Sequence, residues 1–433
     1  MHLSESPFVK GLTCLVCHTS YNDGNHFTCP RCGIQGILDV QYDYDAVASS
    51  FFGHGTPAPK GSPALSSQRP FDMWRYRELL PISPDHHVPH LHIGWTPVYD
   101  VPRLAHAIGI RKLFLKDDGR NPTSSFKDRA SAVGVLKAVE FGFDTIACAS
   151  TGNAASSLAG LSASMGLKSF IFVPERAPEP KITQLLIFGA TVLKVHGTYE
   201  DAFDLCRSAC ERFGWYNRNS GTNPFLVEGK KTAGLEIAEQ CQTHLPDWVV
   251  VSVGDGCTIG GIGKGLQEMK RLGFIDRVPR LLGVQAEGAR PIVDAFKSGT
   301  DLIPSHTHTL ADSIAVGTPR NWRRALGQIR ASNGEMVAIS DDEILDAMRL
   351  TARLAGVFGE PAGITGVAGL RKALGQGMVK SNESVLVCIT GNGLKDIQSA
   401  RQAAGEPIDV EPHLDALTEA LSSRFAQLPH RKS

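Results

Sequence analysis

The sequence has 433 residues, enough for two or three domains, and its 42% hydrophobic and 20% charged residues suit a globular protein with a sizeable core. Lysine plus arginine and aspartate plus glutamate number 44 each, which excludes the basic excess expected of a nucleic-acid binder. No stretch approaches the roughly 20 apolar residues of a membrane helix. These properties favour a small-molecule substrate, with neither a nucleic acid nor a membrane as partner.

The N-terminus has no basic segment followed by an apolar run, so we expect no signal peptide. Ten cysteines in a long chain of this kind argue against a disulfide scaffold. We therefore expect a cytoplasmic protein that stays in a reducing compartment.

Residues 1–45 carry two cysteine pairs, Cys14-x2-Cys17 and Cys29-x2-Cys32, with eleven residues between the pairs. Each pair lies in a short polar turn, and four thiolates in two such turns suit tetrahedral zinc. Four protein ligands leave no open position, which makes such a site structural. Unbound thiols are the alternative. The pattern predicts a zinc ribbon over residues 1–45.

The segment that follows is rich in Gly, Pro and Ser up to about residue 80, which is typical of an extended connector. Its aromatic end, Phe71–Arg77, is expected to dock on the main body. We interpret residues 46–95 as this connector and docking segment.

From about residue 96 short apolar runs alternate with segments of helical spacing. This alternation predicts an α/β protein with parallel sheets covered on both faces. The polar end, residues 411–433, is predicted to be a surface helix or a frayed tail. The predicted strands are 112–116, 145–148, 169–173, 192–195, 249–253, 280–285 and 385–389, and a helix is predicted over 128–139.

Four loops, most of them directly after a predicted strand, carry residues suited to chemistry. Ligands gather at the carboxyl ends of strands in open α/β sheets. The first loop, Asn121–Arg129, holds Lys127 where the helix begins, behind small hydroxyl residues. Partial desolvation there would lower the lysine pKa and make the amine nucleophilic toward an aldehyde. A surface lysine at a helix start is the alternative.

The second loop is Ala149-Ser-Thr-Gly-Asn-Ala154, at a strand end and ahead of a helix. Backbone amides at a helix N-terminus can hold an anion, and Asn153 can donate to a phenolic or carboxylate oxygen. Simple N-capping by the serine or threonine is the alternative.

The third loop has glycines at 254, 256, 260, 261 and 263 between an apolar strand and a helix. The backbone can approach a ligand closely there, and its amides can enclose a phosphate. The fourth loop, Cys388–Asp396, offers the neutral hydroxyl of Thr390 at a strand end, although an ordinary tight turn explains this loop better when it is taken alone.

Taken together, the four loops resemble fold-type II pyridoxal-phosphate enzymes, and most closely the threonine synthase family, over roughly residues 70–400. The resemblance implies two open parallel-sheet domains of the tryptophan synthase β-like kind, added to the N-terminal ribbon. The large, cofactor-binding domain would comprise 96–127 and 221–410, and the small domain 128–220. It also implies a homodimer and the conversion of O-phosphohomoserine to threonine and phosphate.

The roles of family residues carry over where the motifs match. Lys127 corresponds to the Schiff-base lysine and, once released, to a proton carrier, and Asn153 to the partner of the cofactor's phenolic oxygen. Thr390 corresponds to the partner of the pyridine nitrogen. The phosphate cradle would consist of Gly254, Asp255, Gly256, Cys257 and Thr258, and the substrate carboxylate would bind Ser150, Thr151 and Ala154.

The sequence also departs from the family pattern. Ser124 and Ala130 stand where glycine is frequent, and Asn392 stands where histidine is usual. Leu226 or Val227 occupies the place of an arginine that holds the substrate phosphate, and neither can form its bidentate contact.

The missing arginine keeps a second enzyme function open, namely β-elimination or β-replacement on serine, threonine or phosphoserine. A third hypothesis treats the ribbon as a protein- or nucleic-acid-binding module. The zero net charge argues against the nucleic-acid form of that hypothesis.

Overall fold

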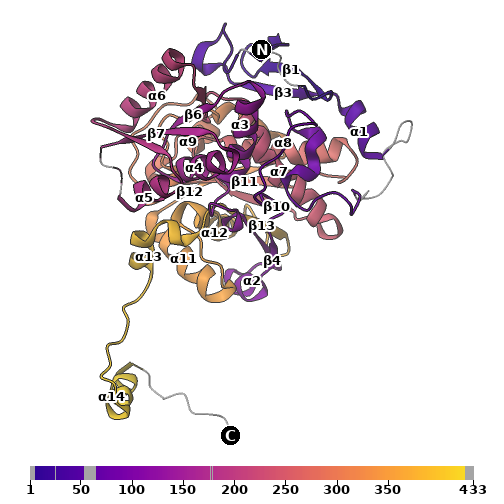
Figure 1. Ribbon diagram of the computed structural model, residues 1–433. Helices are drawn as coiled ribbons and strands as arrows, with labels where there is room; N and C mark the ends of the chain where they lie inside the picture. Colours follow the sequence, from indigo (N-terminus) through magenta and orange to yellow (C-terminus); the bar gives the residue numbers. More distant parts are fainter. Residues whose placement is uncertain (1–4, 25, 53–64, 176, 178, 425–433) are drawn as a thin grey trace.

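The computed structural model describes residues 5–24, 26–52, 65–175, 177 and 179–424. Figure 1 shows the N-terminal segment on one side of a two-sheet body, and a C-terminal extension that projects away from the opposite side. The described part of the chain contains three sheets of three, six and four strands.

The six-stranded sheet has the order β12-β11-β10-β13-β5-β4. Its strands are parallel except for β4, which pairs antiparallel with β5. Strands β10 and β13 are buried along their whole length, as near-continuous apolar runs in a parallel sheet should be. The strands are β4 (Val98–Asp100), β5 (Lys112–Asp117), β10 (Trp248–Ser252), β11 (Arg280–Ala286), β12 (Glu335–Ile339) and β13 (Ser384–Ile389).

The four-stranded sheet has the order β8-β7-β6-β9 and is parallel throughout. The two sheets confirm the predicted α/β class, and all seven predicted strands are present with bounds within one residue. Three strands of these two sheets were not predicted, because β4 and β9 are very short and β12 begins with a glutamate. The strands of this sheet are β6 (Thr145–Ala149), β7 (Lys168–Pro174), β8 (Thr191–Val195) and β9 (Tyr216–Asn217).

Helices cover both sheets (Figure 1). The small sheet packs against α4 (Asn153–Met165), α5 (Glu179–Ile187) and α6 (Tyr199–Phe213). The large sheet packs against α2 (Pro102–Ile108), α8 (Cys257–Arg271), α9 (Pro291–Ser298), α10 (Trp322–Ala331) and α12 (Pro361–Gly375), and α11 (Asp341–Ala355) lies on α12.

Helix α3 (Lys127–Glu140) matches the predicted helix at 128–139 and packs on α7 (Phe225–Gln240). The two helices approach closely because Gly229 has no side chain. A methyl group there would collide with the carbonyl oxygen of Arg129. Helix α7 packs in turn on α8, so these three helices form a continuous buried layer.

The N-terminal sheet has the order β2-β1-β3, with β1 (Val9–Cys14), β2 (Ser20–Tyr21) and β3 (Leu38–Tyr42) antiparallel. It is joined to the body by ion pairs of Asp39 with Lys264 and Arg324. The Tyr42 hydroxyl also donates to Glu228 across 2.9 Å.

The connector is more structured than an extended segment. It contains α1 (Tyr44–Phe52) and the 3-10 turn η2 (Met73–Leu79), and residues 53–64 lie outside the described residues. Arg75 forms a 2.7 Å ion pair with Glu239, which also accepts a 2.6 Å hydrogen bond from Tyr76. The segment expected to be an extended connector thus contains a helix and a 3-10 turn, and its aromatic end packs on α7.

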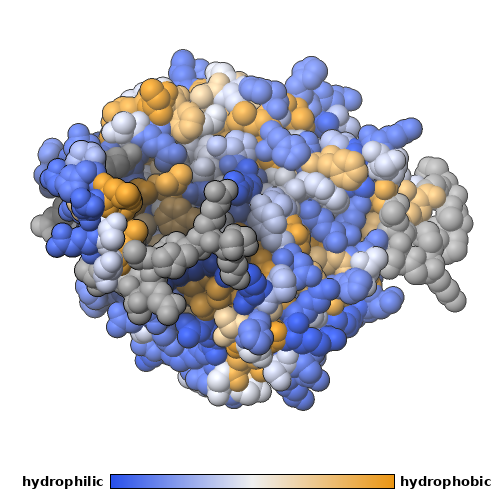
Figure 2. All heavy atoms as spheres, turned by 90° about the horizontal axis from the view of Figure 1, so that it is seen from below, coloured by the Kyte–Doolittle hydropathy of each residue, from blue (hydrophilic) through white to orange (hydrophobic). Residues whose placement is uncertain are grey.

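The C-terminal part contains α13 (Ile397–Ala403) and α14 (Leu414–Arg424), and residues 425–433 lie outside the described residues. Figure 1 shows α14 standing away from the body, and Leu414 is 74% exposed. Figure 2 shows this face from below, with hydrophobic residues interspersed among hydrophilic ones. Among the described helices, none is both long and apolar enough to cross a membrane.

Candidate active site

The first and fourth predicted loops meet, because β5 and β13 are neighbouring parallel strands and both loops leave the same edge of the sheet. The amide of Phe126 donates to the carbonyl of Thr390 at 2.9 Å, and the amide of Asn392 donates to the carbonyl of Ser124 at 3.0 Å. A third segment joins them through a 3.0 Å bond from the Glu360 amide to the Gly391 carbonyl. The three segments therefore form one backbone-linked unit.

Backbone conformation explains the consequences of two departures from the family pattern, at positions 124 and 130. Ser124 has a φ of 64°, a left-handed conformation that glycine adopts without strain. Ala130 lies inside the regular helix α3, where no such conformation is needed. The chain therefore tolerates a strained serine at position 124, whereas the alanine at 130 is conformationally ordinary.

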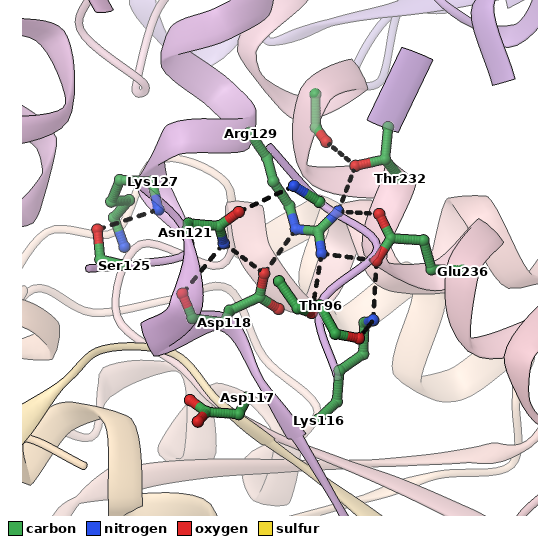
Figure 3. Close-up of polar contacts among 12 residues, drawn as sticks. Thr96, Lys116, Asp117, Asp118, Asn121, Ser125, Lys127, Arg129, Thr232 and Glu236 are labelled. Carbon is green, nitrogen blue, oxygen red and sulfur yellow. Dashed lines mark hydrogen bonds and ion pairs between the residues drawn. The ribbon is translucent and has the colours of Figure 1, made fainter. Parts of the chain in front are cut away.

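Lys127 is the first residue of α3, and its side chain is half-buried. Within the described residues no hydrogen bond or ion pair engages its amino group, and in Figure 3 only its backbone amide is joined to Ser125. Burial lowers the pKa of Lys127 to about 8, and the positive charge of Lys230 acts in the same direction. Its amine is thus partly neutral near physiological pH, which is what nucleophilic attack on an aldehyde requires.

A buried charge network lies beside Lys127 (Figure 3). Arg129 contacts Asp118 at 2.8 Å and also contacts Glu236. Lys116 reaches Glu236 at 2.8 Å, and the side chains of all four residues are fully buried. This network anchors the first turn of α3 to β5 and α7, and so fixes the position of Lys127.

Asn153 begins α4 and faces the same unit. Its side-chain amide donates to Glu360 at 2.5 Å and to the Ser313 hydroxyl at 3.5 Å. Burial raises the pKa of the Glu360 carboxyl. Glu360 precedes a proline at the start of α12, and this position gives no signal in the sequence of the contact with Asn153.

The other members of the second loop lie next to Asn153, at the end of β6. Ser150, Thr151 and Ala154 are partly accessible, whereas the strand before them and the helix after them are mostly buried. The Ser150 hydroxyl accepts a hydrogen bond from the amide of Gly152 at 3.2 Å. This loop therefore presents hydroxyl and amide groups on an accessible surface.

The third loop leaves β10 and starts α8. Gly256 has a φ of 95°, and a methyl group there would lie 2.7 Å from the carbonyl oxygen of Asn321. The Asp255 carboxylate accepts hydrogen bonds from the Arg320 amide, the Asn321 side chain and the Cys257 thiol. The first amides of α8 have no intrahelical acceptor, and Gly254 and Thr258 are partly accessible. This geometry fits a phosphate group.

Thr390 stands at the end of β13, where its carbonyl is used by the Phe126 amide. None of the hydrogen bonds within the described ranges uses its hydroxyl, which is therefore free to donate to a ligand. An aldehyde-reactive amine, a phosphate cradle and a neutral hydroxyl donor together fit the functional groups of pyridoxal phosphate.

The four N-terminal cysteines converge at a separate place. Their sulfur atoms all lie within 4.8 Å of one another, and Cys14 and Cys29 are fully buried. Sulfur ligands of a tetrahedral zinc are separated by about 3.8 Å, given a Zn–S bond of about 2.3 Å. Cys17 and Cys29 lie 3.6 Å apart, close to this value. A methyl group on Gly36 would lie 2.5 and 2.7 Å from the Cβ atoms of Cys29 and Cys32, so a side chain would not fit there.

Comparison with known proteins places this geometry in a family. The family model described as pyridoxal-phosphate dependent enzyme matches residues 90–391, a range that includes Lys127, the glycine-rich loop and Thr390. The chain belongs to this family. It is an enzyme, and pyridoxal phosphate is its cofactor.

The curated relatives of this pyridoxal-phosphate enzyme include threonine synthases. The one from Methanosarcina acetivorans is 40% identical over 414 residues, which cover 95% of this chain and 98% of the relative. The one from Methanocaldococcus jannaschii is 39% identical over 412 residues, covering 94% and 98%. Maize serine racemase has a similar fold, with a TM-score of 0.62, 21% identity and coverage of 71% and 91%.

Proposed function

We propose that this enzyme converts O-phosphohomoserine to threonine and phosphate. Support comes from threonine synthases that match nearly the whole length of the chain. The observation that carries the proposal is the convergence, at one edge of the sheet, of the unpartnered amine of Lys127 with the loops around Asn153 and Thr390.

Each predicted site residue has a role in this proposal. Lys127 bonds covalently to the cofactor and, once released, carries protons between substrate carbons, for which a pKa of about 8 is suitable. Asn153 donates to the phenolic oxygen, and its present acceptor Glu360 orients its amide. The amides of Gly254, Asp255, Gly256, Cys257 and Thr258 hold the cofactor phosphate, and Ser150, Thr151 and Ala154 hold the substrate carboxylate.

Thr390 sets the electronic character of the site. Bound pyridoxal phosphate supplies an electron sink for the charge left when a substrate proton departs. A threonine hydroxyl can donate to the pyridine nitrogen but cannot stabilise its protonated form as a carboxylate does. The sink is then weaker, which suits elimination chemistry over long-lived carbanions.

The test incubates the holoenzyme with O-phosphohomoserine and measures both phosphate and threonine. We expect equal amounts of the two products, and no release above background from Lys127→Ala. The same assay with serine, threonine and phosphoserine examines the alternative of β-elimination or β-replacement. Turnover of one of these in place of O-phosphohomoserine would overturn the proposal.

We further propose a structural zinc ion bound by Cys14, Cys17, Cys29 and Cys32. Their convergence supports it, and so does the anchoring of β3 by Lys264 and Arg324, which makes the ribbon part of the body. Metal analysis of the purified protein should give one zinc per chain. A Cys14→Ser/Cys29→Ser variant that keeps the full zinc content would contradict the assignment.

The remaining expectations are also proposals. A reducing, cytoplasmic location is supported by ten cysteines that all have free thiols. A homodimer rests on the family resemblance, and sedimentation equilibrium tests it. The division into a large domain (96–127 and 221–410) and a small domain (128–220) is supported by the membership of the strands in two separate sheets.

A further inference from the structure

Arg218 is a buried cation that lacks a carboxylate partner. It follows β9 and is 1% exposed. Its guanidinium donates to the Ser131 hydroxyl at 2.9 and 3.1 Å and to the Ser220 hydroxyl at 3.4 Å. Among the residues that the structure describes, no carboxylate forms an ion pair with it. A buried charge without a counter-ion is costly, so an anion supplied by a ligand would complete this site.

The guanidinium lies on the face of α3 that carries Lys127. Residues 127, 131 and 134 are spaced at i, i+4 and i+7 and therefore share one helix face. The Arg218 Cγ lies beside Gly134, and its guanidinium bonds Ser131, so the side chain runs along this face toward Lys127. Ser131, which the guanidinium contacts, lies about one helical turn, ~6 Å along the axis, from Lys127.

Leu226 occupies the same neighbourhood. A methyl group on Gly134 would lie 2.7 Å from Leu226 Cδ2 and 3.7 Å from Arg218 Cγ, so the two side chains are neighbours. Leu226 stands at the first of the two positions where threonine synthases commonly place their phosphate-binding arginine. The loop after β9 therefore places an arginine side chain beside the position on α7 that lacks one.

Other positive groups border this space. Lys230 follows Leu226 by one turn on α7, is 2% exposed, and has no ion-pair partner among the described residues. Arg320 lies against Gly221, and its buried Nη1 has no hydrogen-bond partner. Burial lowers the pKa of Arg218, as expected for a buried guanidinium that has no carboxylate partner. Arg218, Lys230 and Arg320 are all positively charged, so a phosphate group is a suitable ligand here.

We propose that Arg218 binds the phosphate group of the substrate and takes the role of the arginine absent at position 226. This inference rests on the proposed function and assigns its phosphate-binding residue. The cofactor phosphate is the other possible occupant, but its cradle is the glycine-rich loop at the start of α8. The experiment separates the two phosphates.

The experiment measures steady-state kinetics and cofactor affinity for the wild-type holoenzyme, Arg218→Leu, Arg218→Lys and the swap Arg218→Leu/Leu226→Arg. We expect Arg218→Leu to raise KM for O-phosphohomoserine by about 100-fold, because it removes a charge-assisted contact. Arg218→Lys should recover part of that loss, and the swap should recover at least about tenfold by restoring a guanidinium from α7. Arg207→Leu, an exposed arginine on α6, serves as the control and should behave as wild type.

Cofactor affinity decides between the two phosphates. It should be unchanged in Arg218→Leu, as should the change in cofactor absorbance when L-threonine, which has no phosphate, is added. A loss of cofactor affinity that parallels the rise in KM would overturn the proposal. So would an Arg218→Leu variant whose KM equals that of the wild type, or a swap that recovers nothing although the protein folds and binds cofactor.

A second measurement keeps the inference testable if the wild type does not use O-phosphohomoserine, the result that would sink the proposed function alone. The holoenzyme, whose cofactor cradle is filled, is titrated with inorganic phosphate by calorimetry. Binding by the wild type that is lost in Arg218→Leu supports the anion site. Equal binding by both, or none by the wild type, overturns it.

Discussion

Two groups of buried charge lie next to the first turns of α3, and they are built differently. In the first, Arg129 and Lys116 are each paired with a carboxylate (Figure 3). In the second, Lys127, Arg218 and Lys230 have no carboxylate partner within the described residues. Paired charges hold the fold, whereas unpaired ones favour a ligand anion, and the positive charges of Lys230 and Arg218 add to burial in lowering the pKa of Lys127. We propose that this difference separates structural from functional residues, although Arg218 and Lys230 are buried like the paired group.

Breaking a paired charge should have the largest effect. Glu236→Ala would leave Arg129 and Lys116 buried with an uncompensated charge, and should lower the free energy of unfolding by about 3–5 kcal/mol. Denaturant titration measures this. Glu211→Ala, which removes an exposed ion pair with Arg207, should change it by less than about 1 kcal/mol. Equal effects of the two variants would mean that the network is not structural.

The ion pairs of Glu236 with Arg129 and Lys116 also predict that the stability of the protein falls at acid pH. Burial by itself would raise the pKa of Glu236, but Arg129 and Lys116 outweigh it and hold the pKa at about 2. This pKa lies below the ordinary glutamate value of 4.5. The stabilisation by these ion pairs is therefore complete above about pH 4.5 and is lost as pH falls toward 2. Glu236→Ala should therefore flatten the stability profile in this range, measured by denaturant titration at each pH.

The cysteine cluster has the opposite charge: its four thiols can become thiolate anions, and the spacing of their sulfur atoms suits a zinc ion. Removing the metal with a chelator should lower the free energy of unfolding by about 3 kcal/mol, if free zinc stands at a few hundred times its dissociation constant. Differential scanning calorimetry with and without added zinc measures this. The Cys14→Ser/Cys29→Ser variant is the control and should not respond to chelator. An identical response of wild type and variant would contradict a zinc site here.

The unpaired amine of Lys127 should make both the stability of the protein and the rate of cofactor capture depend on pH. The lysine pKa is 10.5 ordinarily and about 8 for folded Lys127, so the unfolded chain binds more protons between these values. Stability of the cofactor-free protein should therefore rise as pH increases from about 8 to 10.5. The rate of cofactor capture should rise through pH 8 as the amine becomes neutral.

Lys230→Met tests the origin of this pH dependence. Removing a neighbouring positive charge should move the midpoint of cofactor capture to higher pH, and stopped-flow absorbance measures it. Lys168→Met is the control, because the Lys168 side chain is 72% exposed on the small sheet. If both variants keep the wild-type midpoint, Lys230 does not act on Lys127.

The smallest expected effects compare a left-handed backbone position before Lys127 with a regular helical position after it. Ser124→Gly removes the left-handed strain and should raise the free energy of unfolding by about 0.5–1 kcal/mol. Ala130→Gly places glycine inside a regular helix and should lower it by about 1 kcal/mol. Thermal unfolding of the two variants measures both. A loss of stability in both would show that Ser124 is not strained.

Much of the fold was predictable because its signals are local. Short apolar runs specified seven strands to within one residue, since strands buried on both faces need continuous hydrophobic residues. The turn at 73–79 in the connector was not predictable in detail, because it depends on burial against α7. Strands β4 and β9 escaped prediction because so short a segment is fixed by its neighbour in the sheet.

By itself the sequence determined the parallel α/β class, the cysteine spacing and the loop that carries Lys127, because each is written in consecutive residues. Only the tertiary structure decided which charges are paired. Glu360 meets Asn153 across 207 positions, and Arg218 meets Ser131 across 87. Such contacts are set by how sheets and helices pack. The family resemblance implied that an arginine is missing near Leu226, and the packing of α3 showed where another guanidinium lies.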